Sequence, residues 1–335
     1  MKWIQNYLSN RSLQVILSGQ ASRTFHFNAS VAQGSILGPL LFSVFIDDLV
    51  DEVDNELLLY ADDGTLYSLV DSVHQRSDVI SSLNQDLTKI KAWADRWKVI
   101  FEPTKCHAMI ISRKRTPFHC NLYYDGKSLP VEKEIKVLGV TFDSKLTWNK
   151  HLSNVSGRAG QKLGALRRIS SKLSVPGRAT VYKSQVRSVM EYSSLAWMGA
   201  APTHLKKLDS VQERAIKVIG VSEEAAATSL NIKPLQHRRN VASATLMYKM
   251  RTDSCPEKLK ELVPPPFVRR RKTRLTSLTE QHAVHQARTR TLSFDRTFIV
   301  SGSSQWNTLP SSVIGTIDTE NLQPLKTRVN KYLLQ

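Results

Sequence analysis

The sequence predicts an α+β protein with a small antiparallel sheet backed by helices, followed by a basic helical domain. Three observations predict this class. Short strand-like segments alternate with helical ones up to residue 148, and after residue 150 apolar residues recur at three- and four-residue steps. The charge divides at the same place, because residues 1–148 hold 16 Lys and Arg against 17 Asp and Glu, whereas residues 149–335 hold 31 against 12.

This division of charge indicates the kind of partner. The whole chain carries a net charge of +18, and all of the basic excess lies in the second half. A basic region joined to a neutral one is typical of proteins that bind a polyanion, of which nucleic acid is the commonest. A basic surface kept for solubility is the alternative, but solubility needs far less charge.

The cysteines Cys106, Cys120 and Cys255 are too few and too scattered for a disulfide framework or a zinc site. Reduced thiols are typical of an intracellular protein. The first residues lack the apolar stretch of a signal peptide, and the longest apolar run, 36–46, is interrupted by Gly and Pro and too short to span a bilayer. We therefore expect an intracellular protein, nuclear or cytoplasmic, with no membrane partner.

The first part of the chain has the pattern of strands around one buried helix. Residues 12–30 alternate around Gly19, which predicts a strand pair. The apolar stretch 37–49 predicts a buried helix with a proline in its first turn. Two short apolar runs, 57–60 and 66–70, flank an acidic turn and predict a β-hairpin with acids at its tip.

The period then changes over residues 78–98, which predict an amphipathic helix with Ser77 as its N-cap. Trp93 and Trp97 lie one turn apart on this helix, and we expect them in the core rather than as platforms for stacking bases. Two further strand segments are predicted after the helix, over 109–111 and over 136–142, the second turning at Leu138-Gly139.

The second half has the pattern of helices with Lys and Arg on their outer faces, and 149–251 is predicted to form the basic helical domain. Its four helices are predicted over 151–173, 177–197, 203–219 and 236–251. Three successive prolines and a run of arginines predict a basic linker over 252–290. A small C-terminal region, 291–335, regains order around Phe294, Trp306 and Leu325.

The sharpest chemical feature is the hairpin tip Tyr60-Ala61-Asp62-Asp63. Adjacent carboxylates repel unless a cation neutralises them. Mg²⁺ prefers hard oxygen ligands and commonly takes one or two carboxylates plus substrate phosphates, which is the arrangement of a two-metal polymerase. An isolated string of this kind is better explained as an ordinary acidic turn.

The string is not isolated, because four other motifs surround it in order. They are Ser30-Val31-Ala32-Gln33-Gly34, Asp47-Asp48, Glu102-Pro103-Thr104-Lys105-Cys106 and Lys136-Val137-Leu138-Gly139-Val140. Order and spacing resemble motifs B, C, D and E of the reverse transcriptase palm, in the style of LINE-type, non-LTR retrotransposons of the jockey and CR1 groups. The resemblance continues through 162–168, 189–192, 208–215 and 306–310.

The resemblance implies RNA-directed DNA synthesis with two Mg²⁺ ions. It makes Asp62 a ligand of both ions, with Asp63 in a secondary role beside it and Tyr60 supporting the hairpin near the primer end. Gln33 and Gly34 would approach the template and nucleotide. Lys105 would protonate or neutralise the departing pyrophosphate.

The resemblance also assigns domains and partners. Residues 1–148 would be a partial palm, with Leu138 and Gly139 in the primer grip, and 149–251 would be a thumb or connection domain. The expected partners are an RNA template, a DNA primer and deoxynucleoside triphosphates, with no small-molecule cofactor beyond the metal. The side chains expected on nucleic-acid phosphates are Arg158, Lys162, Arg167, Arg168, Arg269, Arg270 and Arg271.

The chain departs from the family pattern at several positions. Ala32 stands where the family has a proline, and Glu102 and Cys106 replace its usual neighbours around the motif D lysine. The family's first catalytic aspartate lies in motif A, before motif B, and no Asp or Glu precedes Gln33. Asp47 and Asp48 could substitute, but their place at a helix end favours a structural role. We therefore expect a truncated polymerase, without fingers and motif A, that is inactive alone.

Three hypotheses stay open at this point. The chain is part of an active polymerase, or a non-catalytic nucleic-acid-binding fragment retained by its host, or a remnant whose palm cannot fold. A group II intron maturase shares the hairpin motif, but the region after residue 150 favours the retrotransposon enzyme.

Overall fold

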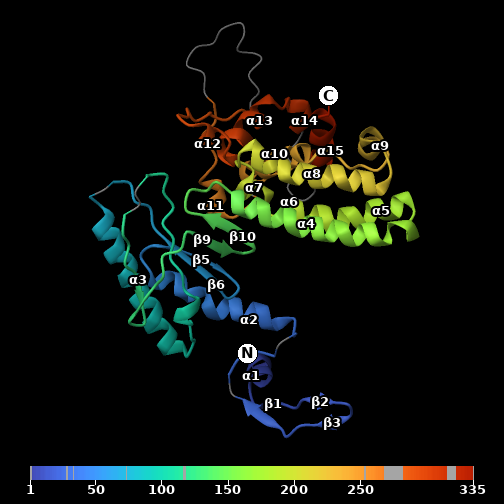
Figure 1. Ribbon diagram of the computed structural model, residues 1–335. Helices are drawn as coiled ribbons and strands as arrows, with labels where there is room; N and C mark the ends of the chain where they lie inside the picture. The colour runs from blue at the N-terminus through green and yellow to red at the C-terminus, as the bar shows by residue number, and fades with distance from the viewer. Residues whose placement is uncertain are drawn as a thin grey trace. The chain divides into compact units, whose positions relative to one another are not determined.

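The computed structural model describes residues 2–27, 29–32, 34–72, 74–115, 118–252, 254–267, 282–314 and 322–334 (Figure 1). It divides into two compact units, Met1–Lys133 and Glu134–Gln335, which we call unit 1 and unit 2. Helices and small antiparallel hairpins make up both units, so the expected α+β class is confirmed. The sequence-based domain boundary at residue 148 lies later, after a hairpin that the structure groups with the helices of unit 2.

The described residues of unit 1 form four separate two-stranded antiparallel pairs: β1 with β4, β2 with β3, β5 with β6, and β7 with β8. Its elements in chain order are α1 (Lys2–Leu8), β1 (Arg11–Leu13), β2 (Ile16–Leu17), β3 (Gln20–Ala21), β4 (Phe25–Phe27), α2 (Leu37–Ile46), the 3₁₀ helix η1 (Asp47–Glu52), β5 (Glu56–Tyr60), β6 (Asp63–Tyr67), α3 (Arg76–Trp97), the 3₁₀ helix η2 (Pro103–Lys105), β7 (Tyr123–Tyr124) and β8 (Lys127–Ser128). The predicted strand pair and acidic hairpin are present. The helix expected over 37–49 is present as α2 and η1, but the expectation that it is buried was wrong, because apolar residues occupy all sides of α2 and one side alone meets the core. Within α2, Gly38 and Ile46 are buried, whereas Leu40 and Val44 are 60% and 69% exposed.

The core of unit 1 forms where α2, η1 and β5 pack against α3. Trp93 is 1% exposed there, as expected, because it faces the aromatic ring of Phe45 and the apolar side of the hairpin. Trp97 is 45% exposed, so the expectation that it lies in the core was wrong. It lies at the last residue of α3, where its ring contacts Phe45 edge-on and leaves one side in solvent.

Asp86 of α3 holds the segment that connects η1 to β5. Its buried carboxylate accepts hydrogen bonds from the backbone N–H groups of Asp54 (3.0 Å) and Asn55 (2.8 Å) and from the Asn55 amide (2.8 Å). Burial opposes the charge, but these donors and the nearby Lys89 lower the pKa of Asp86 below its ordinary value. This contact sets where β5 begins and therefore positions the hairpin.

Two local predictions in unit 1 were wrong. Helix α3 begins at Arg76 after Gln75, and neither Gln75 nor Ser77 caps it by a side-chain hydrogen bond to its first turn. Residues 109–111 form no strand, because pairing there is limited to an isolated parallel bridge between Ala108 and Val131. The backbone at these positions lacks a neighbouring strand with which to continue the ladder.

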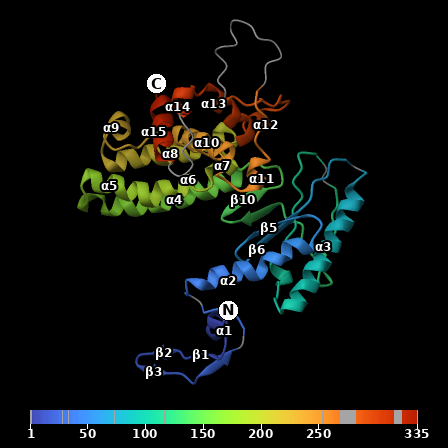
Figure 2. The ribbon, with the colours of Figure 1, turned by 180° about the vertical axis from the view of Figure 1, so that it is seen from behind.

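Unit 2 begins with an antiparallel hairpin and continues as helices, with α4 and α8 side by side in both views (Figures 1 and 2). Its elements are β9 (Glu134–Val137), β10 (Val140–Asp143), α4 (Asn149–Ile169), η3 (Ser170–Lys172), α5 (Val175–Val181), the π-helix η4 (Tyr182–Arg187), α6 (Ser188–Glu191), α7 (Ser194–Trp197), α8 (Pro202–Ile219), α9 (Glu223–Thr228), α10 (Leu235–Arg251), α11 (Glu257–Lys260), α12 (Leu292–Asp295), the π-helix η6 (Phe298–Gly302), α13 (Ser303–Thr308), α14 (Ser311–Ile314) and α15 (Gln323–Tyr332).

Two cores hold unit 2 together. The larger lies between α4, α5, η4 and α8 and contains Trp197 and Leu208. The second joins α10 to α13 and α15 around Trp306. Val284 is fully buried in this second core, so part of the range predicted as a linker is packed. Residues 268–281 of that range lie outside the described residues.

The segment predicted as one helix over 177–197 is divided. Wider turns over Tyr182–Arg187 let Tyr182 and Val186 enter the core, and the chain then breaks at Tyr192 and Ser193, which has a positive φ of 50°. Apolar periodicity alone does not reveal this break, because the buried residues keep helical spacing on both sides of it.

Candidate active site and nucleic-acid interface

The candidate metal ligands lie at the tip of the β5–β6 hairpin. Tyr60 pairs with Asp63, so Ala61 and Asp62 form a two-residue turn. Ala61 has a φ of 51°, as the first central residue of such a turn requires. The side chains of Asp62 and Asp63 are both exposed, and among the described residues neither carboxylate has a hydrogen-bond or ion-pair partner. The turn therefore presents two adjacent, unneutralised carboxylates to solvent.

Apolar residues behind the tip hold the hairpin against the rest of unit 1. Leu57 is buried in the core, and Leu59 and Leu66 pack against it. Tyr60 points to the other side and is 67% exposed. Alternation along β5 thus fixes the base of the hairpin while its acidic end stays accessible.

Asp48 has a structural role, as its position at a helix end indicated. The indole N–H of Trp93 donates to Asp48 Oδ1 at 2.9 Å, which joins η1 to α3. Asp47 begins η1 and is exposed. The structure therefore does not bring Asp48 forward as a replacement ligand beside the hairpin acids.

The loop before α2 contains Gly34, and Gln33 lies outside the described residues. Gly34 has a φ of +83° and an exposed backbone with nothing near the position of a Cβ atom. Ser35 supports this loop, since its hydroxyl accepts from Tyr7 at 2.6 Å and from the Gly38 N–H at 3.0 Å. Arg11 contributes further, by donating to the backbone carbonyl of Ala29 at 2.8 Å. Sequence reasoning missed Tyr7 and Arg11, which carry no motif.

Lys105 is exposed at the end of η2. The turn is formed by Glu102, whose carboxylate accepts from the hydroxyl (3.0 Å) and N–H (3.4 Å) of Thr104. These hydrogen bonds lower the pKa of Glu102. Glu102 therefore has a local structural function that explains why an acid is accommodated beside the lysine.

Leu138 and Gly139 form the turn of the β9–β10 hairpin, with φ values of 47° and 84°. Such a turn needs positive φ at both central residues. The hydroxyl of Tyr192 donates to the Leu138 carbonyl at 2.8 Å, and a Cβ on Gly139 would lie 3.4 Å from the Tyr192 ring. A hollow of about 260 Å³ opens beside this turn and is also lined by Arg158. Tyr192 thus holds the turn in place. It belongs to the motif over 189–192, which did not reveal this contact.

Helix α4 holds the hairpin and presents the expected basic residues. The Thr141 N–H donates to buried His151 Nδ1 at 3.1 Å, and burial followed by the charge of Arg158 lowers the pKa of His151. The buried residues of α4 face α8. Its exposed face carries Arg158, Lys162, Arg167 and Arg168, of which Lys162 donates to Gln185 Oε1 at 3.3 Å. Arg269, Arg270 and Arg271 lie outside the described residues.

The described residues hold no group of three or more His, Cys, Asp and Glu side chains that could bind a metal ion. The geometry therefore offers a pair of exposed carboxylates in unit 1 and several exposed cations on α4 in unit 2. No helix among the described residues is both long and apolar enough to cross a bilayer.

Comparison with known proteins shows what the chain is similar to. Residues 1–142 match the family model of reverse transcriptase (RNA-dependent DNA polymerase). Over 227 residues, 64% of this chain, the sequence is 30% identical to the RNA-directed DNA polymerase from mobile element jockey of Drosophila melanogaster. It is 29% and 27% identical to the probable RNA-directed DNA polymerases from transposon BS and transposon X-element of the same organism, again over 64% of the chain.

These matches confirm the resemblance drawn from the motifs. The chain is related to the reverse transcriptases of LINE-type, non-LTR retrotransposons. It spans about a quarter of the length of these relatives, since the matches cover 24%, 25% and 24% of them.

Proposed function

We propose that this chain supplies palm and thumb parts of an RNA-directed DNA polymerase that copies an RNA template from a DNA primer. The observation that carries the proposal is the β5–β6 turn, which presents Asp62 and Asp63 side by side, exposed and without protein partners among the described residues. Relatives named as RNA-directed DNA polymerases support this chemistry. Residues 1–148, which comprise unit 1 and the β9–β10 hairpin, would form the palm part, and the basic helices of 149–251 the thumb.

The donor set of the turn fits Mg²⁺. Carboxylate oxygens are hard ligands, and Mg²⁺ commonly takes one or two of them plus substrate phosphates rather than a closed protein cage. Asp62 and Asp63 would hold the metal. When bound, Mg²⁺ would neutralise triphosphate charge and activate the primer hydroxyl. Leu57 anchors the base of the hairpin in the core and so holds its acidic end in place.

Other residues of unit 1 would act on the substrates. Tyr60 is exposed next to the acids and would support the primer end. Gly34, with Gln33 before it, would let the backbone approach the template and the nucleotide closely. Lys105, exposed at the end of η2, would protonate or neutralise the departing pyrophosphate.

Unit 2 would bind the template–primer duplex. Leu138 and Gly139 would contact the primer strand from a turn that Tyr192 holds. The exposed cations of α4 would contact phosphates without reading sequence, together with the basic run at Arg269, Arg270 and Arg271.

Primer extension tests the catalytic part of the proposal. The assay uses an RNA template, a DNA primer, Mg²⁺ and deoxynucleoside triphosphates. The proteins are this chain and a chimera in which the chain replaces the matched segment of the jockey relative. We expect extension by the chimera, and Asp62→Asn should reduce the rate more than about a hundredfold, because even loss of a group that only supports a metal ligand costs about 10- to 100-fold.

The matched control is Asp51→Asn, which removes an exposed carboxylate of η1 in the same unit. It should extend primers at the rate of the unaltered chimera. If Asp62→Asn and Asp51→Asn were equally active, the hairpin would not be the metal site and the catalytic proposal would be wrong.

The charge of unit 2 favours a second candidate, a non-catalytic nucleic-acid-binding protein. All of the basic excess lies in this unit, and binding would not need the hairpin acids. An extension-inactive chimera whose nucleic-acid affinity matches that of the relative would select this candidate.

A further inference from the structure

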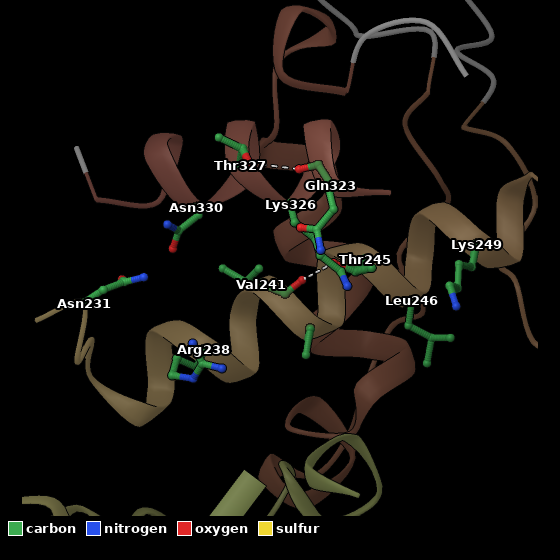
Figure 3. Close-up of a pocket in the computed structure, with 11 residues that line it drawn as sticks. Asn231, Arg238, Val241, Thr245, Leu246, Lys249, Gln323, Lys326, Thr327 and Asn330 are labelled. Carbon is green, nitrogen blue, oxygen red and sulfur yellow. Dashed lines mark hydrogen bonds between the residues drawn. The ribbon is translucent and has the colours of Figure 1, made fainter. Parts of the chain in front are cut away.

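A hollow of about 520 Å³ lies between α10 and α15 in unit 2, and none of the residues that line it was singled out from the sequence (Figure 3). One wall carries Arg238, Thr245 and Lys249 of α10. The other carries Gln323, Lys326 and Asn330 of α15, and Gln323 and Lys326 extend toward α10 in the figure. The volume falls in the range of small-ligand sites, which is about 300–1,000 Å³.

The two helices form this hollow because only part of their surfaces meets. Leu325 and Val329 of α15 are buried with Ala244 and Met247 of α10 in the second core. At one end, Nε2 of His237 lies 2.5 Å from Oδ1 of Asn330 and ties the helices together. Polar side chains of both helices line the hollow, which is open to solvent.

The lining is strongly positive. It includes three cations, Arg238, Lys249 and Lys326, and no Asp or Glu. Arg238 is bound to Glu191, with Nη2 at 2.9 Å from Oε2, but Arg187 lies 3.7 Å from the same carboxylate, so two guanidinium groups share one negative charge. Neither lysine has an ion-pair partner among the described residues, so the hollow has a net positive charge.

This chemistry matches a sugar–phosphate unit. Cations and amide groups bind phosphate oxygens through charge-assisted hydrogen bonds, and both kinds of group line this hollow. Val241 and Leu246 of α10 add apolar surface at the same hollow, against which a ribose or base could pack. We propose that the hollow between α10 and α15 binds a backbone phosphate of a nucleic-acid strand. The inference rests on the proposed function, because it assigns a second contact to the same nucleic acid.

Binding of a fluorescent 12-nucleotide RNA to the full chain tests the inference. The double variant Lys249→Gln, Lys326→Gln should bind about tenfold more weakly at 0.1 M salt, and the log–log slope of its salt dependence should be smaller by about 0.7, the contribution of one phosphate contact on a single strand. The matched control, Lys206→Gln with Lys217→Gln, removes two exposed charges of α8 in the same unit. It should change both quantities less. Equal losses in the two double variants would overturn the inference.

A second measurement separates this inference from the proposed function. Inorganic phosphate should raise the melting temperature of the unaltered chain and not that of the Lys249, Lys326 variant. Phosphate protection without RNA binding would keep the phosphate site, with free phosphate or a mononucleotide as its ligand, and refute the proposed function. If RNA bound equally well to the two double variants and phosphate did not raise the melting temperature, the phosphate site in the hollow would be refuted and the proposed function would stand.

Discussion

Unit 1 leaves many apolar side chains in solvent, whereas the long helices of unit 2 bury theirs. Ile36 is 95% exposed and α1 buries no residue, while Leu152, Leu208 and Ile219 of unit 2 are fully buried. Unit 1 depends instead on single polar anchors such as Asp86 and the Trp93–Asp48 bond. The candidate catalytic residues therefore lie in the unit with the smaller core, and the basic residues expected to bind nucleic acid lie in the unit with the larger core.

Core truncations should have the largest effect on stability and should differ between the units. Leu208→Ala removes the centre of the α4–α8 core and should lower the unfolding free energy of unit 2 by about 4 kcal/mol, because that site cannot collapse. Leu49→Ala in unit 1 should cost about 2 kcal/mol, since its smaller core can relax. Hydrogen exchange followed by mass spectrometry measures each unit separately. Equal changes in both units from either variant would mean that the two cores unfold as one.

Each unit contains a carboxylate, buried or half-buried, whose charge makes stability depend on pH. Burial by itself would raise the pKa of Asp86 in unit 1 and of Asp143 in unit 2. Hydrogen bonds from backbone N–H groups outweigh this effect and lower both pKa values below the ordinary one. A lowered pKa in the folded state stabilises the protein above the unfolded value of about 3.9, and this contribution is lost as pH falls through the folded pKa. Each unit should therefore stay folded at pH 5 and lose stability below about pH 4.

The corresponding amide variants remove this dependence. Asp86→Asn should lower the unfolding free energy of unit 1 by about 2 kcal/mol at pH 7. The variant loses hydrogen bonds to a charged acceptor, and its amide NH₂ group would face the backbone N–H groups of Asp54 and Asn55. Its stability should change less between pH 5 and pH 3 than that of the unaltered chain. An unchanged acid transition, measured by circular dichroism, would show that Asp86 does not control the acid stability of unit 1.

The smallest expected effect is at the hairpin turn. Ala61→Gly relieves the cost of a positive φ, and after the entropy of glycine is subtracted it should stabilise the β5–β6 amides by about 0.5 kcal/mol in hydrogen exchange. The control Ala92→Gly, inside α3, should destabilise unit 1 by about 1 kcal/mol. Destabilisation by Ala61→Gly would mean that the turn does not hold residue 61 in the left-handed region.

Sequence periodicity predicted the elements whose burial is regular. The acidic hairpin, α3, α4, α8 and the turn at Leu138-Gly139 are where the pattern placed them, because alternating or helical spacing reports a single buried face. The break near Tyr192 and the burial of Val284 were not predicted, since they depend on tertiary partners such as Leu138 and Asn307. The short helix α9 was also missed.

The candidate site shows the same limit. Its acids could be named from the sequence because a motif contains them, and their exposure at a two-residue turn agrees with that expectation. The residues that hold the site could not be named, because Asp86 and Arg11 act through backbone groups far along the chain. The basic hollow formed by α10 and α15 was also invisible, since its two walls are separated by 72 or more residues of sequence.

The most direct test of the division between units is the binding of a fluorescent RNA–DNA duplex across salt concentrations. Changing Arg158, Lys162, Arg167 and Arg168 to Gln should lower affinity strongly and reduce the log–log salt slope by about 3 to 4, at about 0.9 per phosphate contact. The matched variant changes four exposed cations of unit 1, Arg113, Lys114, Arg115 and Lys133, and should leave the slope nearly unchanged. Equal losses in both variants would contradict the assignment of duplex binding to unit 2.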